Sequence, residues 1–581
     1  MTRLRLAAAA AFGLAVAGCA TTGPRSTSAP VEIKLIAFND FHGNLEPPKQ
    51  SVDAPRREEG ATRVPAGGAA WLASAIARLR SANPNHAVVS AGDMIGASPL
   101  VSAVFLDEPT IHAMNLVGVD FNAVGNHEFD KGRQELLRMQ KGGCAKHTSR
   151  QPCAVEPFGG ARFNFLAANV RTEDGSTLFP ATGMRTFGKG RRRVKVGFIG
   201  LTLKETPTLV TPSGVAGLTF ADEAETINAL VPKLRSEGAD AIVVLIHQGL
   251  STKVGYNDKD CGGVDGDLLP ILAKLDPAID LVVSGHTHNA YICDYGRIDP
   301  ARPILVTSAG RYGTMVTDIG LTIDPSAGKV TAKRADNLIV QSEAYGNVSL
   351  ATAYPRYEPD AAMAALVKRY ADRAGPVANR VVGKVTGPAL RTRSSSREMV
   401  LGDIIADAHL AATRASGAQI AFTNEYGVRA DLQPGPDGSV TYGQLFAIQP
   451  FGNTLTVKSL TGRQIRALLE QQFDSGSNSV ASPNMLLPSA NVRYAFDLSK
   501  PAGQRILDLR VDGRPIDDAA VYRVAMNSFL ATGGDNFTVF KEGSDPAGGP
   551  IDLDALEAWI ARSSPLTPPA MDRIRDVTPK P

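Results

Sequence analysis

Five apolar segments in the N-terminal half of the chain each run directly into Asp, Asn or His residues. The segments span residues 31–38, 87–90, 121–124, 241–246 and 281–283, and their composition predicts β-strands. Helical patterns separate some of them, at 69–80 and 222–234, so the alternation predicts an α/β layered fold. Ligands of such sheets bind beyond the carboxyl ends of the strands, so we expect these polar ends to meet in one cleft.

The side chains at these strand ends are those that hold divalent transition metals. They are Asp40, His42, Asp93, Asn126, His247, His286 and His288. A single histidine is most often structural, but five of the nine histidines of the chain fall in these segments. Imidazole and carboxylate ligands suit Zn, Mn, Fe or Co. Two such ions, about 3.5–4 Å apart, can clamp a phosphoryl group. The pattern therefore predicts a centre for two divalent ions.

The same segments resemble a known signature. The segments Asp40-Phe41-His42, Gly92-Asp93, Gly125-Asn126-His127-Glu128 and Gly285-His286-Thr287-His288 are similar to those of calcineurin-like metallophosphoesterases. Over about residues 31–545 the chain resembles the bacterial 5′-nucleotidase/UDP-sugar hydrolase family and ecto-5′-nucleotidase. The resemblance implies a four-layer αββα sandwich at 31–350, a linker helix within 351–375 and a smaller α+β substrate-binding domain at 376–560.

The resemblance also implies roles for the residues of the metal centre. One site would use Asp40, His42, Asp93 and His288, and the other Asp93, Asn126, His247 and His286, so that Asp93 bridges both ions. Some nucleotidases of the family have an amide where His288 stands. His127 would be catalytic and oriented by Asp130, and it would stabilise phosphoryl charge or protonate the leaving group. The expected nucleophile is a metal-bound hydroxide.

Three segments of the second domain resemble substrate-binding segments of the family. Asn424, Gly427 and Arg429 keep the register of an Asn-Gly-Gly-Gly-Ile-Arg loop, in which Glu425 and Tyr426 replace two glycines. Phe451 and Phe529 correspond to aromatic residues that stack on a nucleobase, and Asp535 to an acid that binds ribose. Stacking between two rings tolerates different bases, and an arginine can grip phosphate oxygens with two hydrogen bonds.

One departure concerns an arginine that the family usually places seven residues before the glycine matched by Gly402. Here that position is Ser395, so either Arg393 or Arg397, which flank it, is predicted to serve instead. The segment 251–267, rich in Gly and Asp, is an insertion predicted to shape the mouth of the cleft.

The N-terminus predicts export. Arg3 and Arg5 precede an apolar run that ends in Val-Ala-Gly-Cys19, which resembles a lipoprotein signal peptide at residues 1–19 with Cys19 acylated. Residues 20–30 are predicted to form a flexible tether. The expected location is the outer membrane, facing the periplasm. At the other end, residues 561–581 contain five prolines and are predicted to be a loose or irregular tail.

The remaining four cysteines, Cys144, Cys153, Cys261 and Cys293, suit two disulfides in an oxidising compartment. Three pairings are possible. The local one, Cys144–Cys153 with Cys261–Cys293, is favoured because short loops close at the least entropic cost. Free thiols are the alternative.

Together these features predict an exported, lipid-anchored enzyme that hydrolyses nucleoside 5′-monophosphates. UDP-sugars or 2′,3′-cyclic nucleotides are alternative substrates for the same fold, and a nucleotide-binding lipoprotein without activity is the non-enzymatic alternative. The formal net charge of +3 gives no reason to expect binding of a nucleic-acid polymer. Oligomeric state is not predicted.

Overall fold

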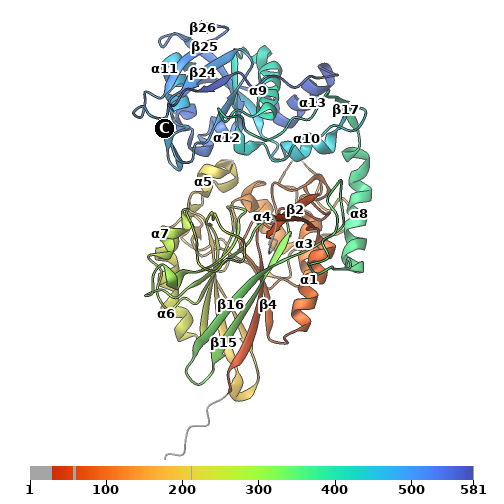
Figure 1. Cartoon of the computed structure of the whole chain (residues 1–581), viewed down its shortest axis with the longest axis vertical. Helices are drawn as coiled ribbons and strands as arrows, with labels where there is room; N and C mark the ends of the chain where they lie inside the picture. Colours follow the sequence, from red (N-terminus) through yellow and green to blue (C-terminus); the bar gives the residue numbers. More distant parts are fainter. Residues whose placement is uncertain (1–28, 56–60, 149, 211, 580–581) are drawn as a thin grey trace, which may run out of the picture.

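The computed structural model describes residues 29–579 except 56–60, 149 and 211 (Figure 1). The predicted signal peptide, Cys19 and most of the predicted tether lie outside the described residues. Among the residues described, no helix combines the length and the apolar character needed to cross a bilayer.

The first six-stranded sheet has the order β16-β15-β1-β4-β5-β6. Its strands are β1 (Val31–Phe38), β4 (His86–Ser90), β5 (Phe121–Ala123), β6 (Asn164–Leu166), β15 (Met315–Asp324) and β16 (Lys329–Ile339). Strands β1, β4, β5 and β6 pair in parallel, whereas β15 and β16 run antiparallel at one edge. The carboxyl ends of β1, β4 and β5 therefore lie at the same edge of the sheet.

The second six-stranded sheet has the order β13-β14-β12-β11-β9-β8. Its strands are β8 (Thr182–Phe187), β9 (Val194–Thr202), β11 (Ala241–His247), β12 (Leu281–Ser284), β13 (Ala290–Asp294) and β14 (Leu305–Ala309). Strands β9, β11, β12 and β14 are parallel, and β8 and β13 are antiparallel edges.

Successive side chains of the central strands point to opposite faces of each sheet and are apolar on both. Each sheet therefore buries one face against the other sheet and its second face under helices. On β1, Ile33 and Leu35 join the core between the sheets with Phe198 and Val243, whereas Ile36 belongs to the core under the helices. Helices α1 (Ala69–Ser81), α3 (Glu108–Val117) and α4 (Arg133–Lys141) cover the first sheet, and α6 (Glu223–Ser236) and α7 (Leu268–Leu272) cover the second (Figure 1). The predicted four-layer αββα sandwich is confirmed.

Smaller elements complete the N-terminal lobe. They are the hairpin β2 (Gln50–Pro55) and β3 (Ala61–Ala66), the pair β7 (Val170–Arg171) and β10 (Thr219–Phe220), and the short helices α2 (Leu100–Ala103) and α5 (Thr206–Leu209).

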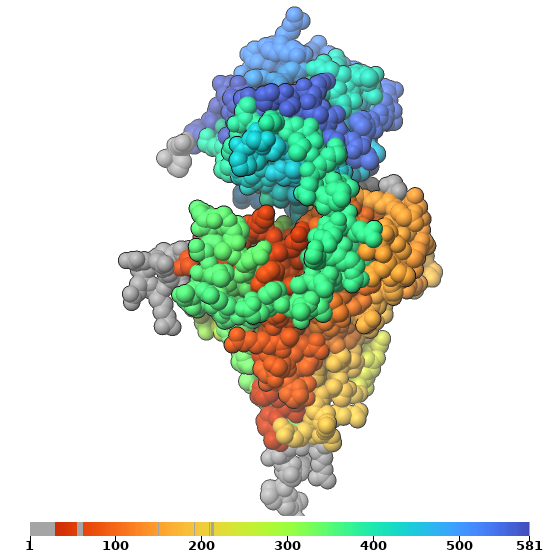
Figure 2. Space-filling model, turned by 90° about the vertical axis from the view of Figure 1, so that its right-hand side faces the viewer, coloured from red at the N-terminus to blue at the C-terminus, as the bar shows by residue number. Residues whose placement is uncertain are grey.

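Helix α8 (Ala361–Ala378) joins the two lobes and crosses the waist between them (Figures 1 and 2). It begins where the Asp360 side chain accepts a hydrogen bond from the Met363 backbone at 2.9 Å. The linker helix is predicted to lie within residues 351–375, but it continues through Pro376 to Ala378. This correction has a simple cause, because a proline near the end of a helix removes only one backbone hydrogen bond.

The C-terminal lobe contains a five-stranded sheet with the order β23-β18-β27-β20-β28 and a four-stranded sheet with the order β26-β25-β24-β29. The strands of the first are β18 (Ile420–Asn424), β20 (Thr454–Thr461), β23 (Leu486–Pro488), β27 (Val521–Asn527) and β28 (Ser544–Ile551). Those of the second are β24 (Val492–Phe496), β25 (Ile506–Val511), β26 (Arg514–Pro515) and β29 (Ile574–Asp576). Two small pairs are β17 (Val381–Lys384) with β19 (Ser439–Thr441), and β21 (Asp474–Ser475) with β22 (Asn478–Ser479).

Five helices pack in this lobe. They are α9 (Val400–Thr413), α10 (Tyr442–Ile448), α11 (Gly462–Glu470), α12 (Ser528–Ala531) and α13 (Asp552–Arg562). Helices α10 and α11 each begin with a capping box, in which Thr441 pairs with Gln444 and Thr461 with Gln464. The lobe is therefore the expected α+β domain.

The C-terminal segment is more ordered than we predicted. Instead of a loose tail, residues Ile574–Asp576 form β29, which pairs in parallel with β24. The buried Arg573 pairs with Asp407 at 2.8 Å, and the Glu398 carboxylate accepts the backbone N–H groups of Arg573 and Ile574. These partners lie far away in the sequence. The prediction of a loose tail used only the local proline content, which does not reveal such contacts.

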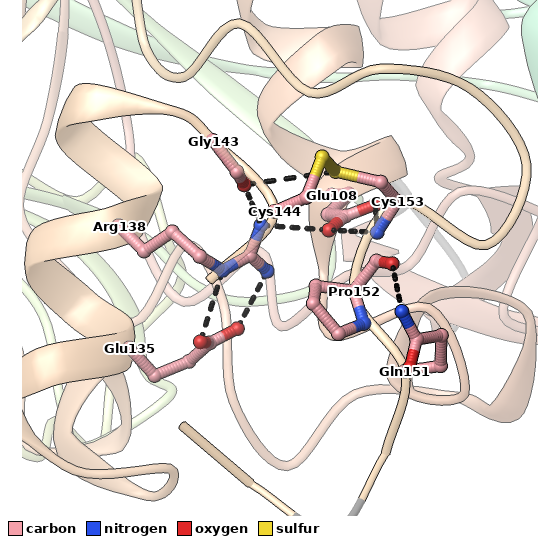
Figure 3. The surroundings of a disulfide bond; sticks show 8 residues. All are labelled: Glu108, Glu135, Arg138, Gly143, Cys144, Gln151, Pro152 and Cys153. Atoms are coloured by element: carbon pink, nitrogen blue, oxygen red, sulfur yellow. Dashed lines mark hydrogen bonds and ion pairs between the residues drawn. A yellow bond between two sulfur atoms is a disulfide. The ribbon is translucent and has the colours of Figure 1, made fainter. Parts of the chain in front are cut away.

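Both predicted disulfides, Cys144–Cys153 and Cys261–Cys293, are present. Figure 3 shows the first, which closes a loop beside a buried ion pair. The Glu108 carboxylate accepts the backbone N–H of Cys153 at 2.9 Å and pairs with Arg138 at 2.7 Å. The disulfide closes the loop, and the contacts of Glu108 attach the loop to α3 and, through Arg138, to α4.

Replacing Cys144 and Cys153 together by serine should lower the free energy of unfolding of the N-terminal lobe by about 3 kcal/mol, because the open loop gains entropy in the unfolded chain. Urea unfolding followed by Trp71 fluorescence in a Trp559→Phe background measures this lobe. Dithiothreitol should destabilise the protein that keeps these cysteines more than the double variant, in which only the Cys261–Cys293 disulfide is left to be reduced. An unchanged urea midpoint for the double variant would contradict the prediction.

Candidate metal centre and adjoining cavity

The loops that follow β1, β4, β5, β11 and β12 converge, and they bring the seven predicted metal ligands together. Asp40, His42 and His247 are completely buried, and Asp93 and Asn126 nearly so. Two clusters form. The ligand atoms of Asp40, His42 and His288 lie within 4.8 Å of one another, and so do those of Asp93, His247 and His286.

Asp93 belongs to the second cluster and also lies close to the first. Its Oδ2 atom is 3.0 Å from Nε2 of His247 in one cluster and 3.5 Å from Nε2 of His42 in the other. The buried Oδ1 atom of Asn126 has no hydrogen-bond partner within the described part of the chain. A buried acceptor without a partner is costly, and a cation would satisfy it. These carboxylate, amide and imidazole donors therefore fit two divalent ions.

The backbone around the centre is constrained. Five of the seven predicted ligands have left-handed φ angles, namely Asp40 (48°), His42 (45°), Asp93 (49°), His286 (70°) and His288 (59°). Non-glycine residues in this conformation concentrate at functional sites, where the surrounding structure holds them. The neighbouring Gly125 allows close packing, because a Cβ atom there would lie 2.2 Å from Oδ1 of Asp93.

Backbone carbonyls orient two of the histidines. The Nδ1 atoms of His42 and His247 lie 2.9 Å and 2.8 Å from the carbonyl oxygens of Gly96 and Ala91, so each Nε2 atom points to the centre. Burial lowers the pKa of His42 and His286 to about 3, so both rings are neutral and can act as ligands. Burial alone would also lower the pKa of His247, but Asp93 and Asp40 raise it to about 10, which indicates a strongly negative environment.

Glu128 holds two of the ligand loops together, a role that the sequence analysis missed. Its buried carboxylate accepts the backbone N–H groups of Asp93, Met94 and Gly125 at 2.7–2.9 Å. Burial and the charge of Asp93 raise the pKa of Glu128 to about 7. In the sequence, Glu128 is marked only by its position directly after His127. That position does not reveal which loops Glu128 joins.

His127 lies beside the metal centre, in the short 3₁₀ helix η1 (His127–Phe129). Its Nδ1 atom is 2.9 Å from Oδ2 of Asp130, as the sequence comparison implied, and Asp130 also accepts the backbone N–H of Ala97 at 3.0 Å. Burial would lower the pKa of His127, but Asp130 and Asp93 outweigh it and raise the pKa. The imidazole is therefore a candidate proton donor toward the cavity.

A cavity of about 830 Å³ extends from the metal centre to the C-terminal lobe. Both lobes line it, at the waist that the space-filling view shows (Figure 2). From the N-terminal lobe it receives Asp93, Asn126, His127, His286 and His288, and from the C-terminal lobe Asn424, Gly427, Arg429, Phe451, Phe529 and Asp535. Part of the 251–267 insertion, tied to β13 by Cys261–Cys293, also lines it at Asp265 and Asp267.

At the C-terminal end of the cavity, Asp535 is held by amide side chains. Asn424 donates to its Oδ2 atom at 2.7 Å, and Asn484, which the sequence analysis did not single out, also hydrogen bonds to this carboxylate. Burial raises the pKa of Asp535 to about 6. Phe529 packs closely on the same turn, because a Cβ atom at Gly534 would lie 2.5 Å from its ring.

Arg393 and Arg397 do not line the cavity, which corrects their predicted role. Arg393 pairs with the buried carboxylate of Glu425 at 2.8 Å, and Arg397 lies in a turn with a φ angle of 63°. Arg391 lines the cavity instead, together with Arg311 and Arg429. Burial, Arg429 and Arg311 lower the pKa of Arg391, which indicates concentrated positive charge at this wall.

Comparisons with known proteins agree with this geometry. Residues 33–290 match the model of the calcineurin-like phosphoesterase family, and residues 381–542 match the 5′-nucleotidase C-terminal domain. The cell wall protein Lmo0130 of Listeria monocytogenes is 30% identical over 93% of this chain and 68% of its own length. Endonuclease YhcR of Bacillus subtilis is 28% identical over 91% of this chain, which spans 40% of that relative. The crystal structure of a 5′-nucleotidase precursor from Thermus thermophilus matches with a TM-score of 0.74 and 27% identity, over 95% of this chain and 100% of that one.

Proposed function

Because this chain belongs to the 5′-nucleotidase family, which joins a calcineurin-like phosphoesterase domain to a 5′-nucleotidase C-terminal domain, we propose that it hydrolyses nucleoside 5′-monophosphates to nucleoside and phosphate. One observation carries the proposal. A single cavity joins two clusters of metal-ligating side chains at one end to two phenylalanines and a buried aspartate at the other.

Asp40, His42, Asp93 and His288 would hold one divalent ion, and Asp93, Asn126, His247 and His286 the other. Two bound ions supply Lewis acidity to the phosphoryl oxygens and lower the pKa of a coordinated water. The ligand types suit Zn, Mn, Co or Fe rather than Ca. Asp93 contributes its charge to both positions, and Glu128 keeps the loops of Asp93 and Asn126 in place.

The phosphate of the substrate would lie between the metal centre and the arginines. Arg391 and Arg429 can donate charge-assisted hydrogen bonds to its oxygens, and Arg311 adds positive charge nearby. His127 uses Nδ1 to bond Asp130, so its Nε2–H is free to donate a proton to the leaving 5′ oxygen. Asp130 stabilises the charged form that makes this donation.

The nucleoside would occupy the C-terminal end of the cavity. Phe451 and Phe529 offer aromatic faces to the base, worth about 1–3 kcal/mol for each stacked ring. Asp535 can accept hydrogen bonds from the ribose hydroxyls, and Asn424 keeps its carboxylate in place. Stacking does not select strongly among bases, so this arrangement supports several nucleoside monophosphates.

A phosphate-release assay over AMP, UMP, UDP-glucose, ATP and 2′,3′-cyclic nucleotides, with Mn or Zn added, tests the proposal. We expect AMP and UMP to be hydrolysed and activity to disappear with EDTA. Faster turnover of UDP-glucose or of cyclic nucleotides would favour a UDP-sugar diphosphatase or a cyclic phosphodiesterase on the same fold. Nucleotide binding without turnover in either metal would contradict an enzymatic function.

Arg391→Ala should raise the KM for AMP about 10- to 100-fold, because one charged hydrogen bond contributes about 1.5–3 kcal/mol. Arg393→Ala is the matched control, since it removes the same charge two residues away, outside the cavity. We expect that control to destabilise the protein by leaving Glu425 unpaired, with KM nearly unchanged. A larger rise in KM for Arg393→Ala than for Arg391→Ala would instead support the substrate-binding role predicted for Arg393.

Export and lipid anchoring through Cys19 form part of the proposal. Two disulfides support an oxidising compartment, and the relative from Listeria is described as a cell wall protein. The outer membrane facing the periplasm is the location that the signal sequence favours.

A further inference from the structure

Phe451 of the C-terminal lobe contacts His127 of the N-terminal lobe. Its ring stacks on the imidazole, with 5.8 Å between the ring centroids and 14° between the planes. Phe451 lies in the loop between α10 and β20, so this contact spans the interface between the two lobes. The guanidinium carbon of Arg429 lies 5.9 Å from the centroid of the same ring.

The contact with Phe451 restrains the tilt of the His127 ring, which the hydrogen bonds of His127 leave free. Asp130 bonds to Nδ1 at one edge of the imidazole, and the backbone N–H of His127 donates to Oδ1 of Asp93 at 2.9 Å. Neither bond fixes the tilt of the ring. His42 meets the imidazole edge-on, at 5.1 Å and 71°, and Phe451 supplies the parallel face. An offset stack of this kind defines the plane of the imidazole.

Phe529, the other phenylalanine that the sequence predicted to bind the base, has different surroundings. It also lines the cavity, but its ring packs on the turn at Gly534 within its own lobe. Among the ring contacts of the described residues, His127 stacks with Phe451 and not with Phe529. Two aromatic residues with the same expected role therefore differ in what they touch.

We propose that Phe451 is a positioning residue for His127, so that the C-terminal lobe completes the catalytic centre as well as holding the nucleoside. The inference rests on the proposed function, because it assigns His127 a role in turnover. Phe451 would act by keeping the imidazole plane aligned with the leaving oxygen. Small errors in the placement of a catalytic group reduce rates strongly, by about 100-fold for 1 Å.

A double-mutant cycle separates positioning from base stacking. Phe451→Leu and Phe529→Leu are each made in the unsubstituted protein and in a His127→Ala background, and kcat and KM for AMP are measured with Mn. We expect Phe451→Leu to lower kcat about 10- to 100-fold when His127 is present. In the His127→Ala background the same change should cost less than about threefold, because residues that act through one another are not additive.

Phe529→Leu serves as the matched control. It should mainly raise the KM for AMP, and by the same factor in both backgrounds. Phe451→Tyr keeps the aromatic face and should retain kcat within about threefold of the unsubstituted protein. If Phe451→Leu loses folded structure or bound metal, Phe451→Met replaces it in the cycle.

Equal losses from Phe451→Leu with and without His127 would overturn the inference, and so would a change confined to KM. If the unsubstituted protein released no phosphate from AMP with Mn or Zn, the proposed function would fail first and the inference with it. The two failures are therefore distinguishable.

Discussion

Asp93→Asn is expected to lower phosphate release from AMP by at least about 10⁴-fold and to leave the protein unable to retain two equivalents of metal. The Oδ2 atom of Asp93 faces His247 and His42, which belong to different ligand clusters, so a neutral amide would weaken both positions. Metal ions contribute several kcal/mol to stabilising the transition state, and each 1.4 kcal/mol corresponds to about tenfold in rate.

Elemental analysis of the purified variant, together with phosphate release after addition of Mn or Zn, checks this expectation. Asp318→Asn provides the control, because it removes a carboxylate of the same lobe that pairs with Lys34 at 2.6 Å, away from the cavity. The control should lose some stability and keep both its metal and its activity. Two retained ions and activity within tenfold of the unsubstituted protein would show that Asp93 is not the bridging ligand.

The metal centre could be predicted from the sequence because its position depends on the direction of the strands. Strands β1, β4 and β5 of the first sheet and β11 and β12 of the second are apolar runs that end at or shortly before a predicted ligand. Parallel pairing brings the ends within each sheet to one edge, and the packing of the two sheets brings the two edges together. Asp40 and His247, for example, can be assigned to the centre from their own segments, without any knowledge of distant contacts. The resemblance to a known family then supplied the pairing of ligands into two sites.

The residues that the sequence misplaced depend on contacts made across long separations. Spacing points to Arg393 or Arg397, but Arg391 lines the cavity, where the distant Asp431 accepts its backbone N–H at 2.7 Å. The C-terminal strand β29 depends on Glu398, which lies 175 residues before Arg573. Spacing within a segment cannot reveal such partners.

The contact between Phe451 and His127 could not be predicted from the sequence for a similar reason. Each residue was singled out within its own segment, one for chemistry and the other for base binding. Their stacking depends on how two lobes meet around α8, and no local pattern encodes that arrangement. Glu128 is a related case, since its role follows from the distance between two loops rather than from its position after His127.

His127→Ala should lower kcat for AMP about 10²- to 10⁴-fold, which is the usual contribution of a positioned general acid. The imidazole lines the cavity beside the metal centre without belonging to either ligand cluster, so both ions should be retained. Asp130→Ala should cause a smaller loss of kcat, because the imidazole remains but loses the carboxylate that orients it and favours its charged form.

Steady-state kinetics with AMP and elemental analysis of the same preparations separate catalysis from metal binding. His147→Ala is the control for removal of a histidine, because His147 is exposed in the disulfide-closed loop and lies away from the cavity. A fall in kcat that tracks a fall in metal content would mean that His127 supports the centre instead of donating a proton. Turnover that survives with full metal content would remove His127 from the mechanism, and with it Asp130, whose carboxylate bonds the Nδ1 atom of the imidazole.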